Sequence, residues 1–491
     1  MNKLTPYPKQ EEAIQRMMAE PTKSILLASE MSQGKTLVLV EFALRSKFNR
    51  VLIVGVKDTF QQFHDRILAQ SDGAVTLRRI DSTAAGKKNE AALEWGEPGW
   101  YFIGQQLFTS RDWKRQEVTD GNGETKKVSV RTKRWQNLEL DLLALDEAHM
   151  AGAYGSNGQK TIHSTRGTWN VAMSGTFYGN SFSNAWAPTR WLWPDIVPAS
   201  YWLWKQDHVQ EEVILKRNGQ PMQTPNGRVL KSEIGEIPPE GQFVASLPCY
   251  IRHVGNDPVP KPKIIDVELS PEQRRMYNAL ENDLLVWIKD HPFTVDFPAT
   301  LRSRLRTATL AQFDFELVWN KKKGREIQEI FFPDNAESTK LDALWDELAL
   351  YPDDNVILGT DSKKFAKLTV ARMVARGMKA VEWSGDVSSK GRDEIKRKFL
   401  AGEIQYIVTV MSSFAAGLDF AQQNCWRMGV LSESDNMTTN AQWVRRVFRT
   451  GPHKDKFEWF KIAAINTYDH GQFANLQLQE LAQKMTLGRT N

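Results

Sequence analysis

The chain has 491 residues, a length that predicts two or three domains. Its two cysteines, Cys249 and Cys425, are too few for a disulfide framework or a four-thiolate metal site, which favours a reducing compartment. The N-terminal segment has no apolar signal core and no run reaches the length of a membrane span, so we expect a cytoplasmic protein. A net charge of +5 is too small to predict nucleic-acid binding by itself.

The first part of the chain alternates short apolar runs with segments of helical period. "SILLAS" (24–29) predicts a buried strand, and "TLVLVEFALRSKF" (36–48) predicts the helix after it. Strands alternating with helices imply a parallel sheet with helices on both faces. Four further strands are expected within 50–56, 99–108, 138–150 and 167–177.

Two segments interrupt this alternation. Short alternating runs flank "DGNG" (120–123), which predicts a hairpin at about 116–130. The surrounding segment, 111–134, holds eight Lys and Arg against four Asp and Glu, as expected for a solvated loop or for an edge that contacts phosphates. A second insertion with a hairpin is expected at 213–237.

Tryptophan is concentrated in one short stretch. Stacking on bases is one interpretation, but packing of a compact helical module is favoured because each ring has a large apolar area to bury. The five residues are Trp186, Trp191, Trp193, Trp202 and Trp204.

The α/β alternation fades after residue 185 and returns near residue 336. The second set of strands is expected at 355–360, 379–385, 404–410, 427–433 and 460–465. We therefore expect an α/β fold with a first lobe at 1–185, a mostly helical insertion at 186–335, a second lobe at 336–470 and a closing helix at 471–491.

"ASEMSQGKT" (28–36) ends like a phosphate-binding P-loop, G-x-x-x-x-G-K-[ST], but has Ser29 in place of the first glycine. Lys35 is suited to neutralise the β- and γ-phosphates of a nucleotide. The Thr36 hydroxyl, at the start of a helix, is suited to ligate Mg²⁺. The amides of the turn would hold the phosphate oxygens.

Two carboxylates end an apolar strand in "LDEAH" (145–149). Open α/β sheets bind ligands at the carboxyl ends of their strands. Asp146 is therefore predicted to hold Mg²⁺, and Glu147 to activate the water that attacks the γ-phosphate. Two surface carboxylates are the alternative, which the upstream phosphate loop disfavours.

"QWVRRVFRTG" (442–451) places Arg446 and Arg449 three residues apart, on one face of a helix. Arginines in this arrangement stabilise the charge of a phosphoryl-transfer transition state. A basic surface helix is the alternative.

Taken together, these motifs resemble the SWI/SNF-like family of double-stranded DNA translocases within the superfamily-two, DEAH-box type of helicase ATPases. "SEMSQGKT" is similar to the family's D-E-M-G-x-G-K-T, with Ser29 for aspartate and Ser32 for glycine. Other segments resemble its opening motif and motifs Ia, III, V and VI; they are "LTPYPKQEEAI" (4–14), "VLIVGVKDTFQQF" (51–63), "MSGTF" (173–177), "VTVMSSFAAGLDF" (408–420) and "QWVRRVFRTG".

Two segments are more diagnostic, because general helicases lack them. "WLWPDIVPASYWLW" (191–204) resembles N-P-D-x-x-x-S-Y-x-x-F, and "IRHVGNDPVPKPKIIDVELSPEQRRMY" (251–277) resembles R-R-T-K…L-P-P-K…L-S-x-x-Q-x-x-x-Y. The chain departs from the family at Pro452, Asp419, Ala416 and the pair Arg252-His253. These departures indicate a divergent member, and the compact length predicts a bacterial or bacteriophage one, in the cytoplasm of a bacterial or phage-infected cell.

The resemblance implies two RecA-like lobes that use ATP and Mg²⁺. It assigns hydrolysis to Glu147 with Lys35, Arg446 and Arg449, and metal binding to Thr36 and Asp146. ATP contacts are expected from Gln10, Ser32, Gln33, Gly34, Lys35, Thr36, Gly417 and Asp419. Coupling is expected from His149, Ser174 and Thr176, and contacts to the DNA backbone from Lys57, Gln105, Thr360, Ser412 and Ser413.

The expected function is an ATP-dependent motor on double-stranded DNA with little sequence preference, in replication, recombination or repair. Proteins of replication or recombination are its expected partners. A strand-separating or branch-remodelling helicase is one alternative, with the 116–130 hairpin as its wedge. A catalytically silent DNA- or partner-binding protein is another. If Ser32 adopts positive φ, we expect some strain in the phosphate loop and weaker ATP binding.

Overall fold

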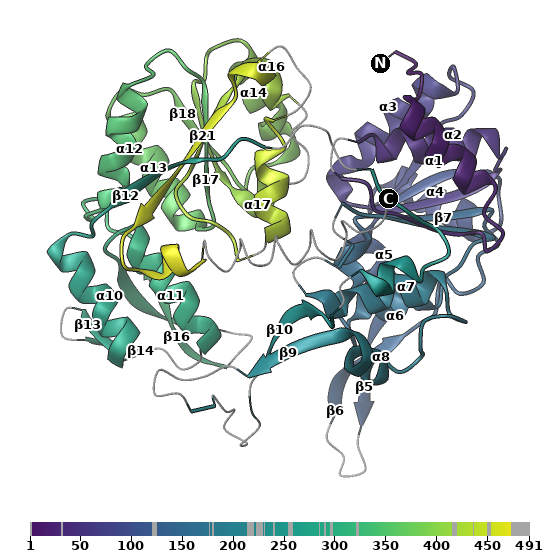
Figure 1. Cartoon of the computed structure of the whole chain (residues 1–491), viewed down its shortest axis with the longest axis horizontal. Helices are drawn as coiled ribbons and strands as arrows, with labels where there is room; N and C mark the ends of the chain where they lie inside the picture. Colours follow the sequence, from purple (N-terminus) through teal and green to yellow (C-terminus); the bar gives the residue numbers. More distant parts are fainter. Residues whose placement is uncertain are drawn as a thin grey trace. The chain divides into compact units, whose positions relative to one another are not determined.

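The computed structural model describes residues 2–30, 33–119, 125–175, 177–178, 181–213, 220–221, 229, 231–238, 241–253, 259–283, 285–288, 291–294, 298–320, 324–414, 420–435, 437–448 and 453–472. Their contacts form two compact units, a first within residues 1–256 and a second within residues 257–478 (Figure 1). Among the described residues, no helix is long and apolar enough to cross a membrane.

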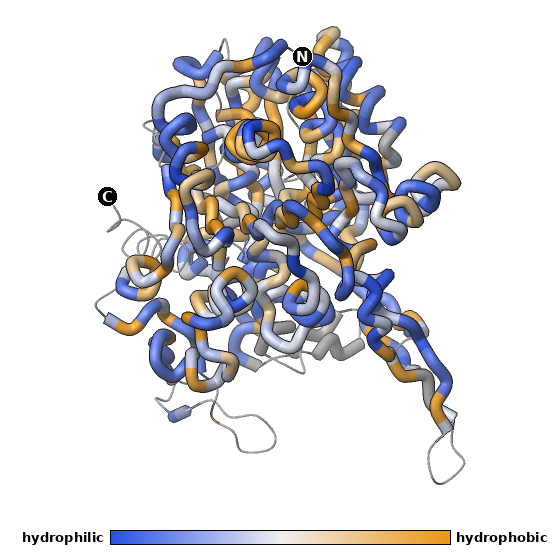
Figure 2. The backbone as a smooth tube through the Cα atoms, turned by 90° about the vertical axis from the view of Figure 1, so that its right-hand side faces the viewer, coloured by the Kyte–Doolittle hydropathy of each residue, from blue (hydrophilic) through white to orange (hydrophobic). Residues whose placement is uncertain are grey.

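The first unit is built on a parallel sheet with the strand order β11-β1-β8-β7-β2-β4-β3. Its central strands are mostly apolar, as expected for strands whose two faces are both covered by helices. In Figure 2, which faces this unit, hydrophobic segments lie mostly in its interior. The strands are β1 (Ser24–Leu27), β2 (Arg50–Gly55), β3 (Leu77–Ile80), β4 (Gly99–Gly104), β7 (Leu142–Asp146), β8 (Trp169–Met173) and β11 (Tyr250–Ile251).

Helices and two hairpins complete the first unit. The helices are α1 (Pro8–Met18), α2 (Lys35–Arg45), α3 (Phe60–Gln70), α4 (Ala84–Glu94), α5 (Gln105–Arg111), α6 (Asn157–His163), α7 (Trp186–Leu192), α8 (Tyr201–His208) and α9 (Gln242–Ala245), with 3-10 turns η1 (Lys57–Thr59), η2 (Ala148–Ala151) and η3 (Phe182–Ala185). The antiparallel hairpins are β5 (Trp113–Thr119) with β6 (Thr125–Arg131), and β9 (Val209–Val213) with β10 (Lys231–Glu236).

The tryptophan-rich stretch packs, as its composition predicts. Four of the five rings are buried in the core of the first unit: Trp186, Trp191, Trp193 and Trp204. Trp202 is the exception, with 58% of its surface exposed.

The second unit is built on another parallel sheet, with the order β12-β21-β20-β17-β19-β18. The strands are β12 (Lys263–Val267), β17 (Val356–Thr360), β18 (Ala380–Trp383), β19 (Tyr406–Val410), β20 (Arg427–Val430) and β21 (Glu458–Ala464). Its helices are α10 (Pro271–Asp283), α11 (Pro298–Leu310), α12 (Thr339–Ala349), α13 (Lys363–Ala375), α14 (Ser389–Leu400), α15 (Met411–Phe414), α16 (Ala421–Asn424) and α17 (Met437–Val444), with the 3-10 turn η4 (Lys454–Lys456). Its hairpins are β13 (Leu285–Ile288) with β14 (His291–Thr294), and β15 (Asp314–Asn320) with β16 (Arg325–Phe331).

The predicted fold class, two parallel-sheet α/β lobes of the RecA-like kind, is confirmed. The segment predicted as one helical insertion is distributed over both units, because β11 pairs with β1 of the first sheet and β12 with β21 of the second. Its described residues also contain six hairpin strands, β9, β10 and β13 to β16. The four-part division of the chain remains a prediction, and the closing helix lies outside the described residues from residue 473 onward.

A buried ion pair joins α12 to the segment after β21 in the second unit. The Lys340 ammonium lies 2.6 Å from Asp469 Oδ2 and donates to the Leu431 carbonyl at 2.8 Å. Both charged side chains are almost fully buried. Removing one partner of a buried pair leaves an uncompensated charge, which is strongly destabilising.

We therefore expect Lys340→Met to lower the free energy of unfolding by about 3–5 kcal/mol, measured by urea denaturation. Lys363→Met is the matched control, because Lys363 pairs with Asp386 at the surface and should contribute little. Equal losses in the two variants would contradict the assigned role of the buried pair.

Candidate functional site

Three strands of the first sheet end side by side at one edge. Register pairs Leu27 at the end of β1 with Met173 at the end of β8, and Met173 with Asp146 at the end of β7. The phosphate loop, the "SGTF" segment and the two carboxylates therefore leave the sheet at the same level. This edge is where parallel α/β sheets bind ligands.

The end of the phosphate loop is shaped by Gly34, the N-cap of α2. Its φ of 76° is left-handed, a conformation that glycine adopts without steric cost. A Cβ at this position would also lie 2.3 Å from Gln10 Nε2. Backbone conformation and close approach thus both require glycine here. Ser32 lies outside the described residues, so its predicted strain stays a prediction.

Gln10 lies against this turn. Its Oε1 accepts from the Tyr7 amide at 3.0 Å, and its Nε2 donates to the Gln33 carbonyl at 3.0 Å. The side chain is buried and locked by both bonds. It therefore joins α1 to the phosphate loop, next to the position where the sequence predicts the nucleotide.

Lys35, the first residue of α2, reaches back across the loop. Its Nζ donates to the carbonyls of Ser29 at 2.7 Å and Glu30 at 3.0 Å. Thr36 follows it in the first turn of the helix and is half-buried. The ammonium, the hydroxyl and the N-terminus of α2 are thus held at one end of the loop, an arrangement that suits an anionic ligand.

Ser29, where phosphate loops have glycine, has a structural role. The Ser29 hydroxyl accepts from the His253 amide at 3.1 Å, and the Glu30 amide donates to the His253 carbonyl at 2.9 Å. Arg252 Nη2 lies 3.7 Å from Glu30 Oε1. These bonds fasten the start of the loop to the residues after β11. No local sequence pattern predicts this contact, since the two segments lie more than two hundred residues apart.

The two predicted carboxylates differ in their surroundings. Burial and the neighbouring Glu147 charge raise the pKa of Asp146 to about 7, and the Lys35 charge offsets part of this rise. Glu147 is a non-glycine residue with left-handed backbone, at φ 52° and ψ 50°. Such strain persists only where the surrounding structure holds it, and it occurs preferentially at functional sites.

Gln105 holds this strained turn. Its Nε2 donates to the Asp146 carbonyl at 2.5 Å and also lies 3.4 Å from the Glu147 carbonyl oxygen. The side chain, at the start of α5, was predicted to contact DNA. In the structure its amide fixes the backbone that carries both carboxylates, and its contact with DNA stays a prediction.

His149 connects the carboxylates to the neighbouring strand end. Its Nδ1 lies 2.9 Å from Ser174 Oγ and 3.3 Å from Glu147 Oε2. The Ser174 amide donates to the Leu27 carbonyl at 3.2 Å. His149 and Ser174, both predicted to couple the site to DNA, thus bridge the ends of β7, β8 and β1. Thr176 lies outside the described residues.

The remaining predicted DNA contacts differ in exposure. Lys57 in η1 and Ser412 in α15 are exposed, and Ser413 is half-buried. Thr360 is fully buried, and its hydroxyl lies 2.9 Å from Ser432 Oγ. The Thr360 hydroxyl therefore lies inside the second unit, and its contact with DNA stays a prediction.

The predicted site residues of the second unit are described only in part. Arg446 follows α17 and is 8% exposed. Arg449, Gly417 and Asp419 lie outside the described residues.

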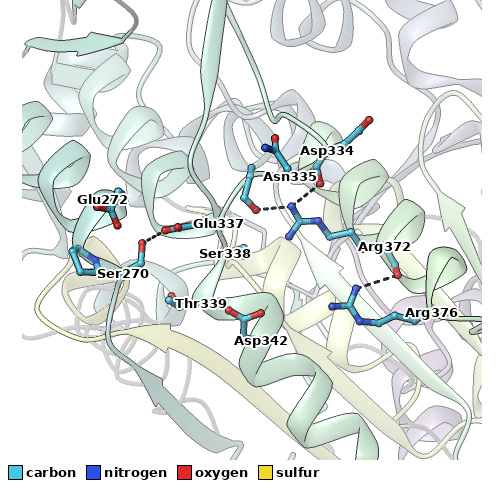
Figure 3. Close-up of a pocket in the computed structure, with 12 residues that line it drawn as sticks. Ser270, Glu272, Asp334, Asn335, Glu337, Ser338, Thr339, Asp342, Arg372 and Arg376 are labelled. Carbon is cyan, nitrogen blue, oxygen red and sulfur yellow. Dashed lines mark hydrogen bonds between the residues drawn. The ribbon is translucent and has the colours of Figure 1, made fainter.

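One cavity in the described part of the chain contains none of the predicted site residues. It measures about 630 Å³ and lies in the second unit, between the starts of α10 and α12 and the end of α13 (Figure 3). Arg372, which lines it, donates to the carbonyls of Asp334 at 2.8 Å and Ala336 at 2.5 Å. The Arg376 guanidinium lies 4.4 Å from the centre of the Trp345 ring. Both arginines are thus engaged within the unit, and the cavity does not present a second anion site.

Comparisons with known proteins add little to this geometry. No family model and no curated protein matches the chain. Among solved structures, the chain is similar to a "Sulfolobus solfataricus SWI2/SNF2 ATPase core in complex with dsDNA", with 15% identity over 99% of this chain and 97% of that chain, and a TM-score of 0.39. At this identity and score, a functional assignment depends on the site residues themselves.

The crowding at Gly34 generates a prediction. Gly73 has a similar φ of 81° but would meet nothing within 4 Å if a Cβ were added. Gly73→Ala should therefore report the cost of left-handed backbone alone, about 1–2 kcal/mol in the free energy of unfolding. Gly34→Ala should cost clearly more in urea denaturation, because it also displaces Gln10. Equal costs would contradict the close approach.

Proposed function

We propose that the chain is an ATP-driven motor of the SWI/SNF-like family that acts on double-stranded DNA. The observation that supports this most directly is the register of β1, β8 and β7, which brings the start of the phosphate loop and the carboxylates Asp146 and Glu147 to the same end of the sheet. Lys35, the first residue of α2, follows β1 through the phosphate loop, and Asp146 is the last residue of β7. A phosphate-binding lysine that acts on a strand-end carboxylate is the arrangement that hydrolysis of a nucleoside triphosphate requires.

The nucleotide would be held by the first unit through the phosphate loop. Lys35 and the amides at the start of α2 would bind the phosphate oxygens, and Gln10 and Gln33 would border the base side of the loop. Asp146 and Thr36 offer hard oxygen donors, which suit Mg²⁺. Mg²⁺, when bound there, would neutralise charge on the β- and γ-phosphates.

Glu147 would orient the attacking water and accept its proton. Gln105 would hold its backbone in the strained conformation, and His149 with Ser174 would transmit the state of the site to the end of β8. Arg446 and Arg449 remain the proposed transition-state arginines, with Gly417 and Asp419 as further nucleotide contacts from the second unit.

Double-stranded DNA as the partner rests on the two family-specific segments, 191–204 and 251–277. Lys57, Ser412 and Ser413 remain the proposed contacts to its backbone. Backbone contacts carry no sequence information, so we expect little sequence preference. Proteins of replication, recombination or repair would be its functional partners.

A strand-separating helicase is the second candidate, and the projecting hairpin β5–β6 favours it. Strand displacement from a tailed duplex distinguishes the two candidates, since a pure translocase moves along DNA without releasing a strand. The silent-protein alternative is weakened by the role of Ser29, because this departure from the family pattern fastens the loop to His253.

Glu147→Gln tests the proposed chemistry. The amide cannot accept the proton, so we expect phosphate release in the presence of duplex DNA to fall by at least about 100-fold. Glu139→Gln, an exposed carboxylate on the same segment, is the control and should retain activity. Full DNA-stimulated activity in Glu147→Gln would refute the assignment, and measurement with RNA in place of DNA tests the choice of nucleic acid.

Gln105→Ala tests the positioning of the carboxylate turn. Loss of the bonds to Asp146 and Glu147 carbonyls should reduce kcat about tenfold while KM for ATP changes little, since a slight misplacement of a catalytic group has effects of this order. Gln105→Asn keeps the amide on a shorter side chain, so its loss in kcat should be smaller than that of Gln105→Ala. The neighbouring exposed Gln106→Ala serves as the control. An effect on KM alone would assign Gln105 to substrate binding instead.

A further inference from the structure

The hairpin β5–β6 is a two-stranded sheet that projects from α5 and α6 of the first unit (Figure 1). Its strands pair from Trp113 with Arg131 to Thr119 with Thr125. Seven residues per strand give a ribbon about 20 Å long. All described side chains beyond the first pair are exposed, so both faces of the ribbon are open to solvent.

An isolated two-stranded ribbon is only marginally stable in water, so its base must be held. Asp112, which is fully buried, does this. It accepts from Arg131 Nε at 2.7 Å, from Thr161 Oγ1 at 3.1 Å and from the Arg134 amide at 2.8 Å. The hairpin therefore leaves the unit in a fixed direction.

The cations of this basic segment fall into two groups. The first group forms ion pairs at the base of the hairpin: Arg111 with Glu90, Arg131 with Asp112 and Arg134 with Glu94. Lys114 and Arg115, beyond the base, are exposed, and among the described residues neither lies in an ion pair. Being consecutive in a strand, they point to opposite faces of the ribbon.

The ribbon also exposes an apolar stripe. Val118, Val128 and Val130 are each 40–44% exposed and lie on the same face as Lys114, by the register of the two strands. Figure 2 shows this mixture of hydrophilic and hydrophobic stretches along the projecting ribbon. Exposed cations on both faces of a held ribbon match a ligand whose charge is negative and repeated, and a two-stranded ribbon is one of the elements that the major groove of B-DNA admits.

We propose that the hairpin β5–β6 is an arm that contacts a DNA duplex through its phosphates, with Lys114 and Arg115 as contacts. This inference rests on the proposed function, which supplies the duplex as ligand. Helix α5 connects the arm to the site, since Gln105 at its start holds the Glu147 turn and Asp112 directly after its end holds the hairpin.

The test measures binding of the full chain to a fluorescently labelled blunt-ended DNA duplex. Fluorescence anisotropy is the readout, and no nucleotide is added. Lys114→Glu combined with Arg115→Glu should weaken binding at least about tenfold at 0.1 M salt. The slope of log affinity against log salt should become shallower by about 2, because each lost phosphate contact removes about 0.9. The neutral pair Lys114→Gln and Arg115→Gln should change the slope in the same direction.

Lys87→Glu combined with Lys88→Glu is the matched control, since these are also neighbouring exposed lysines of the first unit and should leave the affinity nearly unchanged. Thermal melting of each variant checks that it is folded. The proposal is overturned if the hairpin pair binds like the wild type, or if it loses no more affinity than the control pair. It is also overturned if the hairpin pair changes only self-association, measured by sedimentation, because the arm would then be a protein interface.

Duplex binding and DNA-stimulated phosphate release are measured in separate assays, so the two proposals can fail independently. A wild-type chain that binds duplex through the arm but shows no DNA-stimulated phosphate release would refute the proposed motor and support the arm. Stimulated release that is intact in the wild type, together with unchanged binding by the hairpin variants, would refute only the arm.

Discussion

The candidate site depends on the register of β1, β8 and β7, which aligns the ends of these three strands. Leu27, Met173 and Asp146 lie side by side, so each chain segment leaves the sheet at the same edge. A shift of one residue in any of these strands would turn its side chains to the opposite face of the sheet. The buried apolar residues of all three strands therefore fix the position of the polar groups that follow them.

The polar groups at this end of the sheet are held by residues from other segments of the chain. Gln105 bonds the backbone of the two carboxylates, His253 bonds Ser29, and Gln10 bonds Gln33. They hold conformations that the chain would not adopt alone, including the left-handed backbone of Glu147. A geometry held in this way before the ligand arrives requires little reorganisation during a reaction.

Helix α5 connects the turn that carries the two carboxylates to the base of the hairpin β5–β6. Its first residue bonds the carboxylate turn, and Asp112 immediately after it bonds the base of the projecting hairpin. A displacement of the ribbon would therefore reach the proposed catalytic carboxylate through seven residues of helix. If the ribbon contacts DNA, binding and hydrolysis share this element.

The sequence by itself determined most strands of the two sheets, all but β3, β11 and β12, and the packing of four tryptophans, because hydrophobic period and turn residues report local conformation and burial. Only the tertiary structure decided that Tyr250–Ile251 and Lys263–Val267 join different sheets, that Gln105 supports Glu147, and that Thr360 is buried. Each of these depends on a partner distant in the chain. Local periodicity shows that a residue is buried or polar, but the partner that it pairs with is set by how the strands and helices pack.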